Sequence, residues 1–186
     1  MQNPRLPSES VDKRVYNQNA SFLIMERSPI ERCGQLDLQL ANTLAYMNFL
    51  RHGLKMPRAQ DIDRGVFRRV SKGCVYHIVD VTSHDPMGFW FDEFDAESAL
   101  DGGRNYTGLV LGEYPDPVIK DFLSRSYSAP RNSNTARLDK ITWLATEERP
   151  EFYCYYRYVY PLASDGYHVD KILVVVNVAS HADYSG

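Results

Sequence analysis

The residues best suited to hold a polar ligand lie in one tyrosine-rich stretch, residues 151–161. Strand alternation places Tyr156 on one face of this stretch and Arg157 on the other. Phenols and a guanidinium combine apolar contact with hydrogen bonding, and a guanidinium also attracts anions. We therefore predict a ligand pocket lined partly by this strand and partly by aromatic side chains elsewhere. Its candidate residues are Trp90, Phe122, Trp143, Tyr156 and Arg157.

The same residues also allow two other interpretations. In the structural one, the aromatic rings pack across neighbouring strands, and Arg157 forms an ion pair with Asp80. In the enzymatic one, Asp80 acts as a base and Tyr156 as a proton donor in a buried pocket, where burial would tune their pKa values. Such a pair is typical of small isomerases and dehydratases. The sequence leaves these alternatives open.

Cysteine and histidine spacing does not predict a metal site. The three cysteines, Cys33, Cys74 and Cys154, stand far apart and form no CxxC or Cys/His cluster. We expect reduced thiols in a cytoplasmic protein. Of the five histidines, only His77 falls in a stretch that reads as a buried strand, and we interpret it as a hydrogen-bonded core histidine.

The composition argues against a nucleic-acid-binding protein. The chain has 186 residues and a formal net charge of -3, whereas nucleic-acid-binding proteins usually carry a basic face. No run of 18 apolar residues is present, so we expect no membrane span. One short basic element, Arg64 to Arg69, carries an Arg-x-x-x-Arg spacing, and we interpret it as a solvated turn.

A helix is predicted from about Leu36 to about His52. Gly53 is a typical stop signal, and Pro57 prevents the helix from resuming. Its apolar stripe must cover either the domain's own sheet or a second copy of the chain. We predict a homodimer, with an interface formed by Leu36, Leu40, Leu44 and Met47.

The remaining pattern predicts two strands, a helical block and three strands. The strands are expected near residues 74–81, 89–94, 137–146, 151–161 and 169–179. Asp116 followed by Pro117 starts a helix that we expect to end before Pro130. This order favours an α+β fold, a five-stranded antiparallel sheet with helices on one face and an extra N-terminal helix. We expect a partly mobile arm over 1–34, in which 20–25 could dock, a domain over 35–180 and a tail over 181–186.

The order of elements and several residues resemble a PAS domain, in particular a bacterial group of short, stand-alone PAS-like proteins common in alphaproteobacteria. The similarity extends over about Leu36 to Val178. It rests on an ordered set of residues: Arg51, Gly53, Pro57, Asp61-Ile62-Asp63, Asp80, the aromatic stretch Phe89 to Phe94, Tyr106-Thr107-Gly108, Tyr156-Arg157 and Pro161-Leu162. The chain departs from the group after Asp63, where Arg64-Gly65 stands in place of a proline.

The resemblance implies a sensor or protein-interaction module. Such domains hold a small ligand between sheet and helices, or dimerise through flanking helices, and the output comes from a partner. The cofactor is unknown, although haem and flavin are not expected. The helix after Asp116 lacks the histidine of haem-binding members, and Gly103-Arg104-Asn105 is followed by Tyr106 where flavin-binding members have a reactive cysteine.

Three functions follow as expectations. The first is a non-enzymatic sensory or regulatory module in signal transduction, which binds an unidentified small ligand or signalling protein and acts through dimerisation. The second is the Asp80–Tyr156 enzyme described above. The third is a ligand-free interaction scaffold whose core is filled by its own aromatic side chains. The sequence names neither the ligand nor the partner.

Overall fold

The computed structural model describes residues 13–18, 21–28, 38–95, 104–144 and 153–177. Seven antiparallel strands form one sheet, in the order β1-β2-β5-β6-β7-β3-β4. The five strands from β3 onward are the predicted ones, and they lie in the order second, first, fifth, fourth, third. The predicted α+β class and antiparallel sheet are confirmed. The strands are β1 (Lys13–Gln18), β2 (Ser21–Ser28), β3 (Cys74–Asp80), β4 (Trp90–Phe94), β5 (Arg137–Leu144), β6 (Tyr153–Leu162) and β7 (Lys171–Asn177).

The first two strands extend the sheet beyond its five predicted members. They come from the segment that we expected to be an arm, and they pair as a hairpin against the outer edge of β5. An unpaired strand edge offers free N–H and C=O groups, which a further strand satisfies. Most of residues 20–25, a stretch that the sequence suggested could dock, belong to β2 and pair with β5. The sequence could not show that residues 13–18 would join them.

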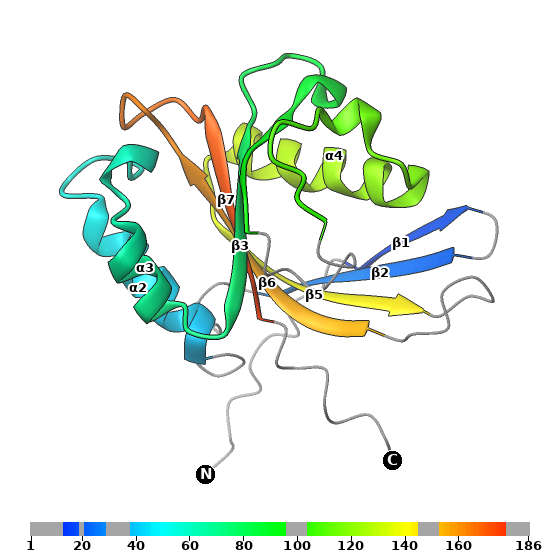
Figure 1. The fold of residues 1–186 in the computed structure, drawn as a ribbon, viewed down its shortest axis with the longest axis horizontal. Helices are drawn as coiled ribbons and strands as arrows, with labels where there is room; N and C mark the ends of the chain where they lie inside the picture. Colours follow the sequence, from blue (N-terminus) through cyan, green and yellow to red (C-terminus); the bar gives the residue numbers. More distant parts are fainter. Residues whose placement is uncertain (1–12, 19–20, 29–37, 96–103, 145–152, 178–186) are drawn as a thin grey trace, which may run out of the picture.

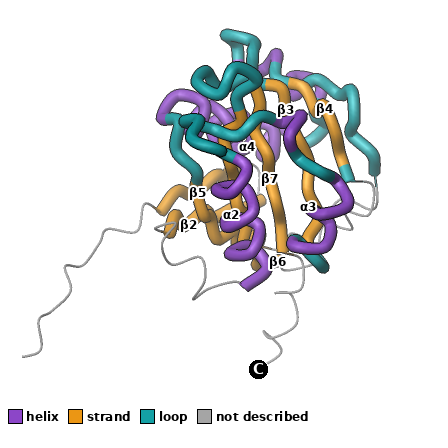
Figure 2. Tube along the Cα trace, turned by 90° about the vertical axis from the view of Figure 1, so that its left-hand side faces the viewer, coloured by secondary structure: helices purple, strands orange, loops and turns teal. Residues whose placement is uncertain are grey.

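Helices cover the two faces of the sheet separately (Figure 1). The long helix α4 (Pro117–Ser133) lies on one face, together with the short 3-10 turns η3 (Pro86–Gly88) and η5 (Leu111–Glu113). The helices α2 (Leu38–Leu50) and α3 (Arg64–Val70) lie on the other face, which is called the α2/α3 face below. The 3-10 turn η2 (Ala59–Asp61) lies between these two helices in the chain. Figure 2 shows α2 and α3 side by side in front of the strands.

The helix α4 begins as predicted but ends later. Its N-cap, Asp116, accepts hydrogen bonds from the backbone N–H groups of Val118 (2.8 Å) and Ile119 (3.1 Å). The prediction that the helix ends before Pro130 is wrong, because α4 continues to Ser133 and closes on Asn134 in the left-handed conformation. Pro130 lies in the last turn and cannot donate the helical hydrogen bond to the carbonyl of Ser126, but its ring is buried.

The apolar stripe of α2 packs on the domain's own sheet. Leu40 and Met47 have no exposed surface, and Leu50 is nearly as buried. They contact a core that includes Ile78 and Leu173 from the strands. Leu44 is half-buried, and Leu36 lies outside the described residues. The predicted dimer remains a prediction, but Leu40 and Met47 offer no surface for it.

Candidate functional site

The buried guanidinium of Arg157 is the centre of the candidate site. Arg157 lies in the middle of β6 and is only 2% exposed. It shares the α4 face with Val159, whereas Tyr158 and Tyr160 belong to the core under α2 and α3. The predicted alternation of this strand is confirmed. A buried charge is costly unless it is paired, so its neighbours decide what it can do.

Asp139 neutralises Arg157 from the directly opposite position on β5. Its Oδ2 atom accepts hydrogen bonds from Arg157 Nη2 (3.0 Å) and Nε (3.3 Å). From α4, the hydroxyl of Ser126 accepts a further bond from Nη2, and the ring of Phe122 lies 4.4 Å from the guanidinium carbon. These bonds engage Nε and Nη2 of the guanidinium.

The hairpin strand β2 closes the same cluster from the side. Met25 places its sulfur atom 3.9 Å from Arg157 Nη2. Arg27 Nε lies 3.7 Å from Asp139 Oδ1, which is too long for a hydrogen bond. That oxygen is buried and accepts no hydrogen bond within the described part of the chain. The carboxylate of Asp139 therefore lies between two guanidinium groups that come from different strands.

A histidine and a tyrosine extend the cluster toward β3. His77 Nε2 lies 2.9 Å from the hydroxyl of Tyr127 on α4. The imidazole stacks on Phe94, with ring centroids 5.3 Å apart, and meets Phe91 edge-on. Burial, reinforced by the positive charge of Arg157, lowers the pKa of His77 to about 3. The imidazole is therefore neutral at physiological pH, which agrees with its interpretation as a structural histidine.

Two phenols near Arg157 also stay neutral. Burial raises the pKa of Tyr127 and of Tyr155, and the nearby charge of Arg157 only partly opposes this. His77 and both tyrosines thus keep one protonation state across the neutral range. The cluster offers hydrogen-bond donors and a buried positive charge. That chemistry suits the recognition of an anionic or polar group better than the transfer of protons.

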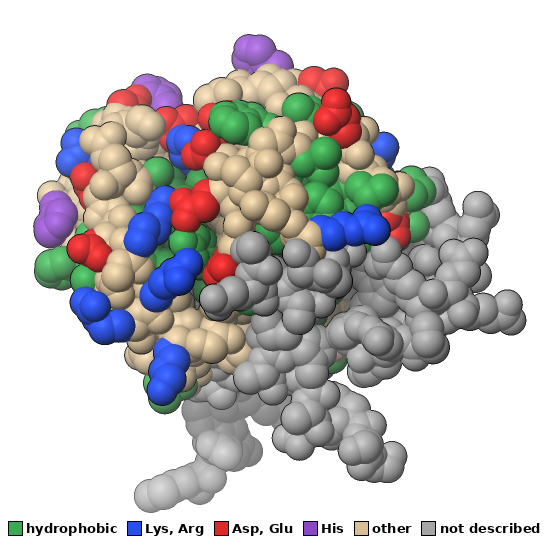
Figure 3. All heavy atoms as spheres, in the orientation of Figure 1, with side chains coloured by type: hydrophobic (Ala, Val, Ile, Leu, Met, Phe, Trp, Pro, Cys, Tyr) green, Lys and Arg blue, Asp and Glu red, His purple; other side chains and the backbone are tan. Residues whose placement is uncertain are grey.

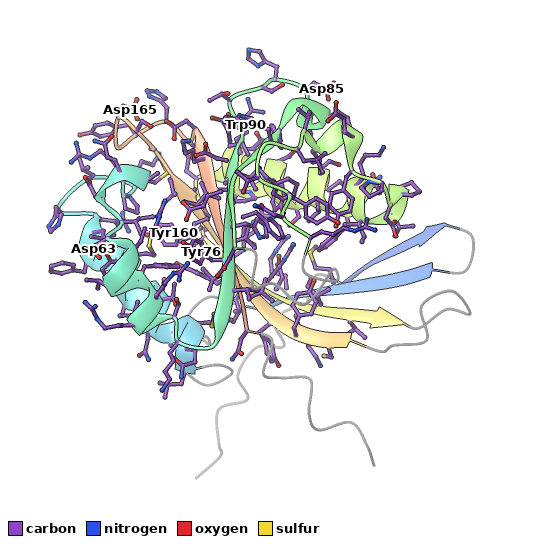
Figure 4. The ribbon with its side chains drawn as sticks, in the orientation of Figure 1. Asp63, Tyr76, Asp85, Trp90, Tyr160 and Asp165 are labelled. Atoms are coloured by element: carbon purple, nitrogen blue, oxygen red, sulfur yellow. The ribbon has the colours of Figure 1, made fainter. Side chains whose placement is uncertain are left out.

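The five residues predicted to line a pocket are only partly brought together. Phe122 and Arg157 are in contact on the α4 face. Tyr156 packs against the core on the opposite face. Trp90, labelled near the top of Figure 4, is 38% exposed at the start of β4. It pairs with Asp80 at one end of β3, whereas Arg157 is in register with Val75 near the other end. Trp143 occupies a position on β5, but its side chain lies outside what the structure describes.

The predicted partners of Asp80 are also separated from it. Asp80 pairs with Lys171 at one end of β7, whereas Tyr156 pairs with Asn177 at the other end. Six residues of strand span roughly 20 Å, so Asp80 and Tyr156 cannot share one pocket in this fold. Asp80 accepts hydrogen bonds from the backbone N–H and hydroxyl of Thr82 instead. Arg157 does form an ion pair, but with Asp139; the prediction of Asp80 as its partner is wrong.

The other candidate motifs form local structure. The segment after Gly103 is a turn in which the Asn105 side chain accepts from the N–H of Thr107 (2.9 Å), and Tyr106 packs in the aromatic core. The basic element predicted as a turn is the helix α3. Arg64 pairs with Glu93, and Arg68 and Arg69 are exposed. Figure 3 shows several Lys and Arg side chains (blue) on the left, the side on which α3 lies in Figure 1. Among the described residues, no three His, Cys, Asp or Glu side chains gather closely enough to hold a metal ion.

Sequence reasoning missed most of the polar side chains in the cluster around Arg157: Arg27, Ser126, Tyr127 and Asp139. One signal was available. Asp139 is an acidic residue between Leu138 and Ile141 in a strand that is otherwise apolar on its buried positions. A buried carboxylate in a strand requires a cationic partner, and the only arginine of the tyrosine-rich stretch was the natural choice. A second signal is Ser126, which lies one helical turn after Phe122 on the buried face of α4.

Comparison with known proteins adds no name. No family model matches the chain, no curated protein is significantly similar to it, and no solved structure matches its fold significantly. None of the helices in the described ranges has the length and apolar character needed to cross a membrane. What is established is an α+β fold built on an antiparallel sheet, with a buried Arg157–Asp139 pair on the α4 face.

Proposed function

We propose that this protein is a non-enzymatic sensory or regulatory module of PAS-like architecture that binds a small anionic ligand at Arg157. One observation carries the proposal. The guanidinium is almost fully buried on the face that α4 covers, where Asp139 and Ser126 bind it through Nε and Nη2. A guanidinium carries five N–H donors in a planar fork, so it is also able to bind a ligand carboxylate or phosphate oxygen. The PAS resemblance places ligands on this side of the sheet, between the strands and the helical block.

The position of Arg157 also suits signal transmission. Its neighbours come from β2, α4 and β5, so one ligand would touch three elements that are distant in the chain. An anion that binds the guanidinium would compete with Asp139 for it and would weaken the contacts of Arg157 with Met25 on the hairpin and with Ser126 on α4. The free energy of binding would thereby shift the packing of these elements. The output would come from a protein partner or from dimerisation.

A second candidate is the ligand-free interaction scaffold. It is favoured by the aromatic side chains that fill the α4 face beside the cluster. The rings of Phe91, Phe94, Tyr106 and Tyr114 form a continuous set, with neighbouring centroids 5.1–6.4 Å apart. Aromatic packing of this density stabilises the core without any ligand. In that case only the exterior of the domain would carry function.

The test is to look for a ligand and then to probe the site with simple anions. Native mass spectrometry of the freshly purified chain would report any bound small molecule. Thermal unfolding would then be followed in the presence of acetate, succinate or inorganic phosphate, with chloride at equal ionic strength as reference. A bound anionic compound, or a rise in Tm specific to one of the three anions, supports the proposal. The mass of the bare chain together with no specific rise would favour the scaffold.

Variants separate the site from general salt effects. Arg157→Lys retains the positive charge but loses the fork of N–H donors, so the anion-specific rise in Tm should disappear. Ser126→Ala removes one hydrogen bond to the guanidinium with little change in volume. The variant should still fold, and its anion-specific rise in Tm should differ from that of the unmodified chain. Arg125→Ala is the matched control, because Arg125 is exposed on α4 and forms an ion pair with Asp121 one helical turn earlier. A rise that survives in Arg157→Lys would refute the site.

A further inference from the structure

The outer face of α2 is unusual because it carries no charge. The 13 residues of α2, LQLANTLAYMNFL, include no acidic or basic residue. By contrast, α4 carries Lys120, Asp121, Arg125 and Arg131, and three of the seven residues of α3 are arginines. A helix on the surface of a globular protein normally presents charged side chains to water. Depletion of charge is instead typical of the core of protein interfaces.

The two most exposed large apolar side chains of the described residues both lie on this helix. Leu38 is 67% exposed and Phe49 is 68% exposed. Between them lie Asn42 and Ala45, which are also exposed. The spacings of four, three and four residues place all four side chains on one stripe. At 100° per residue, that stripe lies roughly opposite the buried Leu40 and Met47, which face the sheet.

We propose that this outer stripe is the contact surface between two copies of the chain, with the two α2 helices packed antiparallel. The pattern of the stripe is self-complementary. A two-fold axis midway between Asn42 and Ala45 brings Leu38 of one protomer onto Phe49 of its partner, and Asn42 onto Ala45, twice over. Leu38 and Phe49 are about 16 Å apart along the helix, so two separate apolar contacts form. The small side chain of Ala45 lets the helices approach at the crossing.

A second copy fits this face better than a charged partner. The stripe has no ionic group to attract or orient an acidic or basic protein, whereas it matches its own apolar ends and polar centre. A helix of 13 residues is about 20 Å long, so one helix pair covers less area than most stable interfaces bury. The dimer is therefore concentration-dependent, as suits a regulated association. This inference deepens the proposed function, since it names the surface through which the module would dimerise.

Sedimentation velocity of the full chain over a wide range of concentration tests the interface. The unmodified protein should pass from monomer to dimer. Phe49→Glu should raise the dissociation constant roughly a hundredfold, because each dimer loses two apolar contacts. Tyr167→Glu is the matched control, since Tyr167 is another exposed aromatic residue, 56% exposed, outside α2. It should dimerise like the unmodified chain. A monomeric unmodified protein, or an unchanged Phe49→Glu, would overturn the proposal.

The antiparallel register has its own test. The double variant Leu38→Glu, Phe49→Lys places opposite charges together in the proposed dimer, so dimerisation should return and weaken as salt is added. The double variant Leu38→Glu, Phe49→Glu places like charges together and should stay monomeric. If the Glu/Lys variant is monomeric too, the register is refuted. Circular dichroism checks that each variant is folded. The anion-dependent rise in Tm of Phe49→Glu should equal that of the unmodified chain. The α2 interface and the Arg157 site can therefore be refuted separately.

Discussion

On the α4 face of the sheet an arginine and an aspartate are buried together, whereas the buried polar side chains described on the α2/α3 face, such as Thr43 and Ser71, carry no charge. Arg157 and Asp139 are each at most 2% exposed. On the α2/α3 face, Tyr76 donates to Glu93 Oε1 (2.6 Å) and Tyr160 donates to Asn48 Oδ1 (3.2 Å). The rings of both tyrosines lie between sheet and helices in Figure 4.

This difference changes what a single substitution costs. A charge that loses its partner inside a protein cannot recover solvation, so its cost is large. A hydroxyl that loses its partner at the rim can bond to water, so its cost is small. The α4 face is therefore the sensitive one, and a ligand that competes for Arg157 would have a large effect there. The α2/α3 face provides a rigid support for the outer stripe of α2.

The largest expected effect is that of Asp139→Ala. It leaves Arg157 buried without its counter-ion and should lower the free energy of unfolding by about 3–5 kcal/mol. Urea unfolding followed by tryptophan fluorescence measures this. Asp121→Ala is the control, because Asp121 forms a solvent-exposed ion pair with Arg125 on α4, and it should cost about 0–1 kcal/mol.

Replacing both members of the buried pair sharpens this result. In Asp139→Leu, Arg157→Leu no buried charge is left alone, so the double variant should be clearly more stable than Asp139→Ala. If it is equally unstable, the cost comes from lost packing rather than from an unpaired charge, and the contrast between the two faces would fail.

The next effect is a pH dependence that originates at His77. Its pKa falls from 6.5 to about 3 on folding, so between these values the unfolded chain binds more protons than the folded one. Stability should therefore fall as the pH falls through this window, by an amount on the order of a few kcal/mol. The free energy of unfolding of His77→Gln should show a shallower slope over the same window. Equal slopes would mean that His77 is not buried as a neutral ring.

A smaller effect compares one tyrosine from each face. Tyr127→Phe leaves the ring nitrogen of His77 without its hydroxyl partner in the core, and should cost about 1–3 kcal/mol. Tyr160→Phe frees the side chain of Asn48, which is exposed and can bond to water, and should cost less than about 0.5 kcal/mol. Thermal or urea unfolding of both variants measures the two losses in the free energy of unfolding. A larger loss for Tyr160→Phe would reverse the comparison.

The smallest predicted effect concerns the first turns of the two covering helices. Asp63 caps α3 by accepting from the N–H of Val66 (2.9 Å), and Asp116 caps α4 in the same way. Asp63→Ala and Asp116→Ala should each cost about 1 kcal/mol, because each leaves orphan N–H groups that water can partly satisfy. Similar losses for the two would show that the faces differ in their buried charge and not in how their helices start.

Local patterns in the sequence predicted the helix starts and the faces of the strands well. The period of two along β6 correctly separated Arg157 from Tyr158, and Asp116-Pro117 correctly marked the start of α4. The end of α4 was missed because packing of the buried Pro130 outweighs its reluctance to sit in a helix. The site was predicted in part: Phe122 and Arg157 are in contact, but Tyr156 and Trp90 lie elsewhere.

By itself, the sequence determined the α+β class, the alternation of β6 and the uncharged character of α2, since each depends on residues close together in the chain. Only the tertiary structure decided that Asp139 faces Arg157, that the hairpin β1–β2 completes the sheet, and which stripe of α2 stays in water. Those outcomes depend on the register between β5 and β6 and on which edges and faces remain uncovered. Register and coverage are set by the packing of the whole domain, because each strand must satisfy its hydrogen bonds and bury one face at the same time.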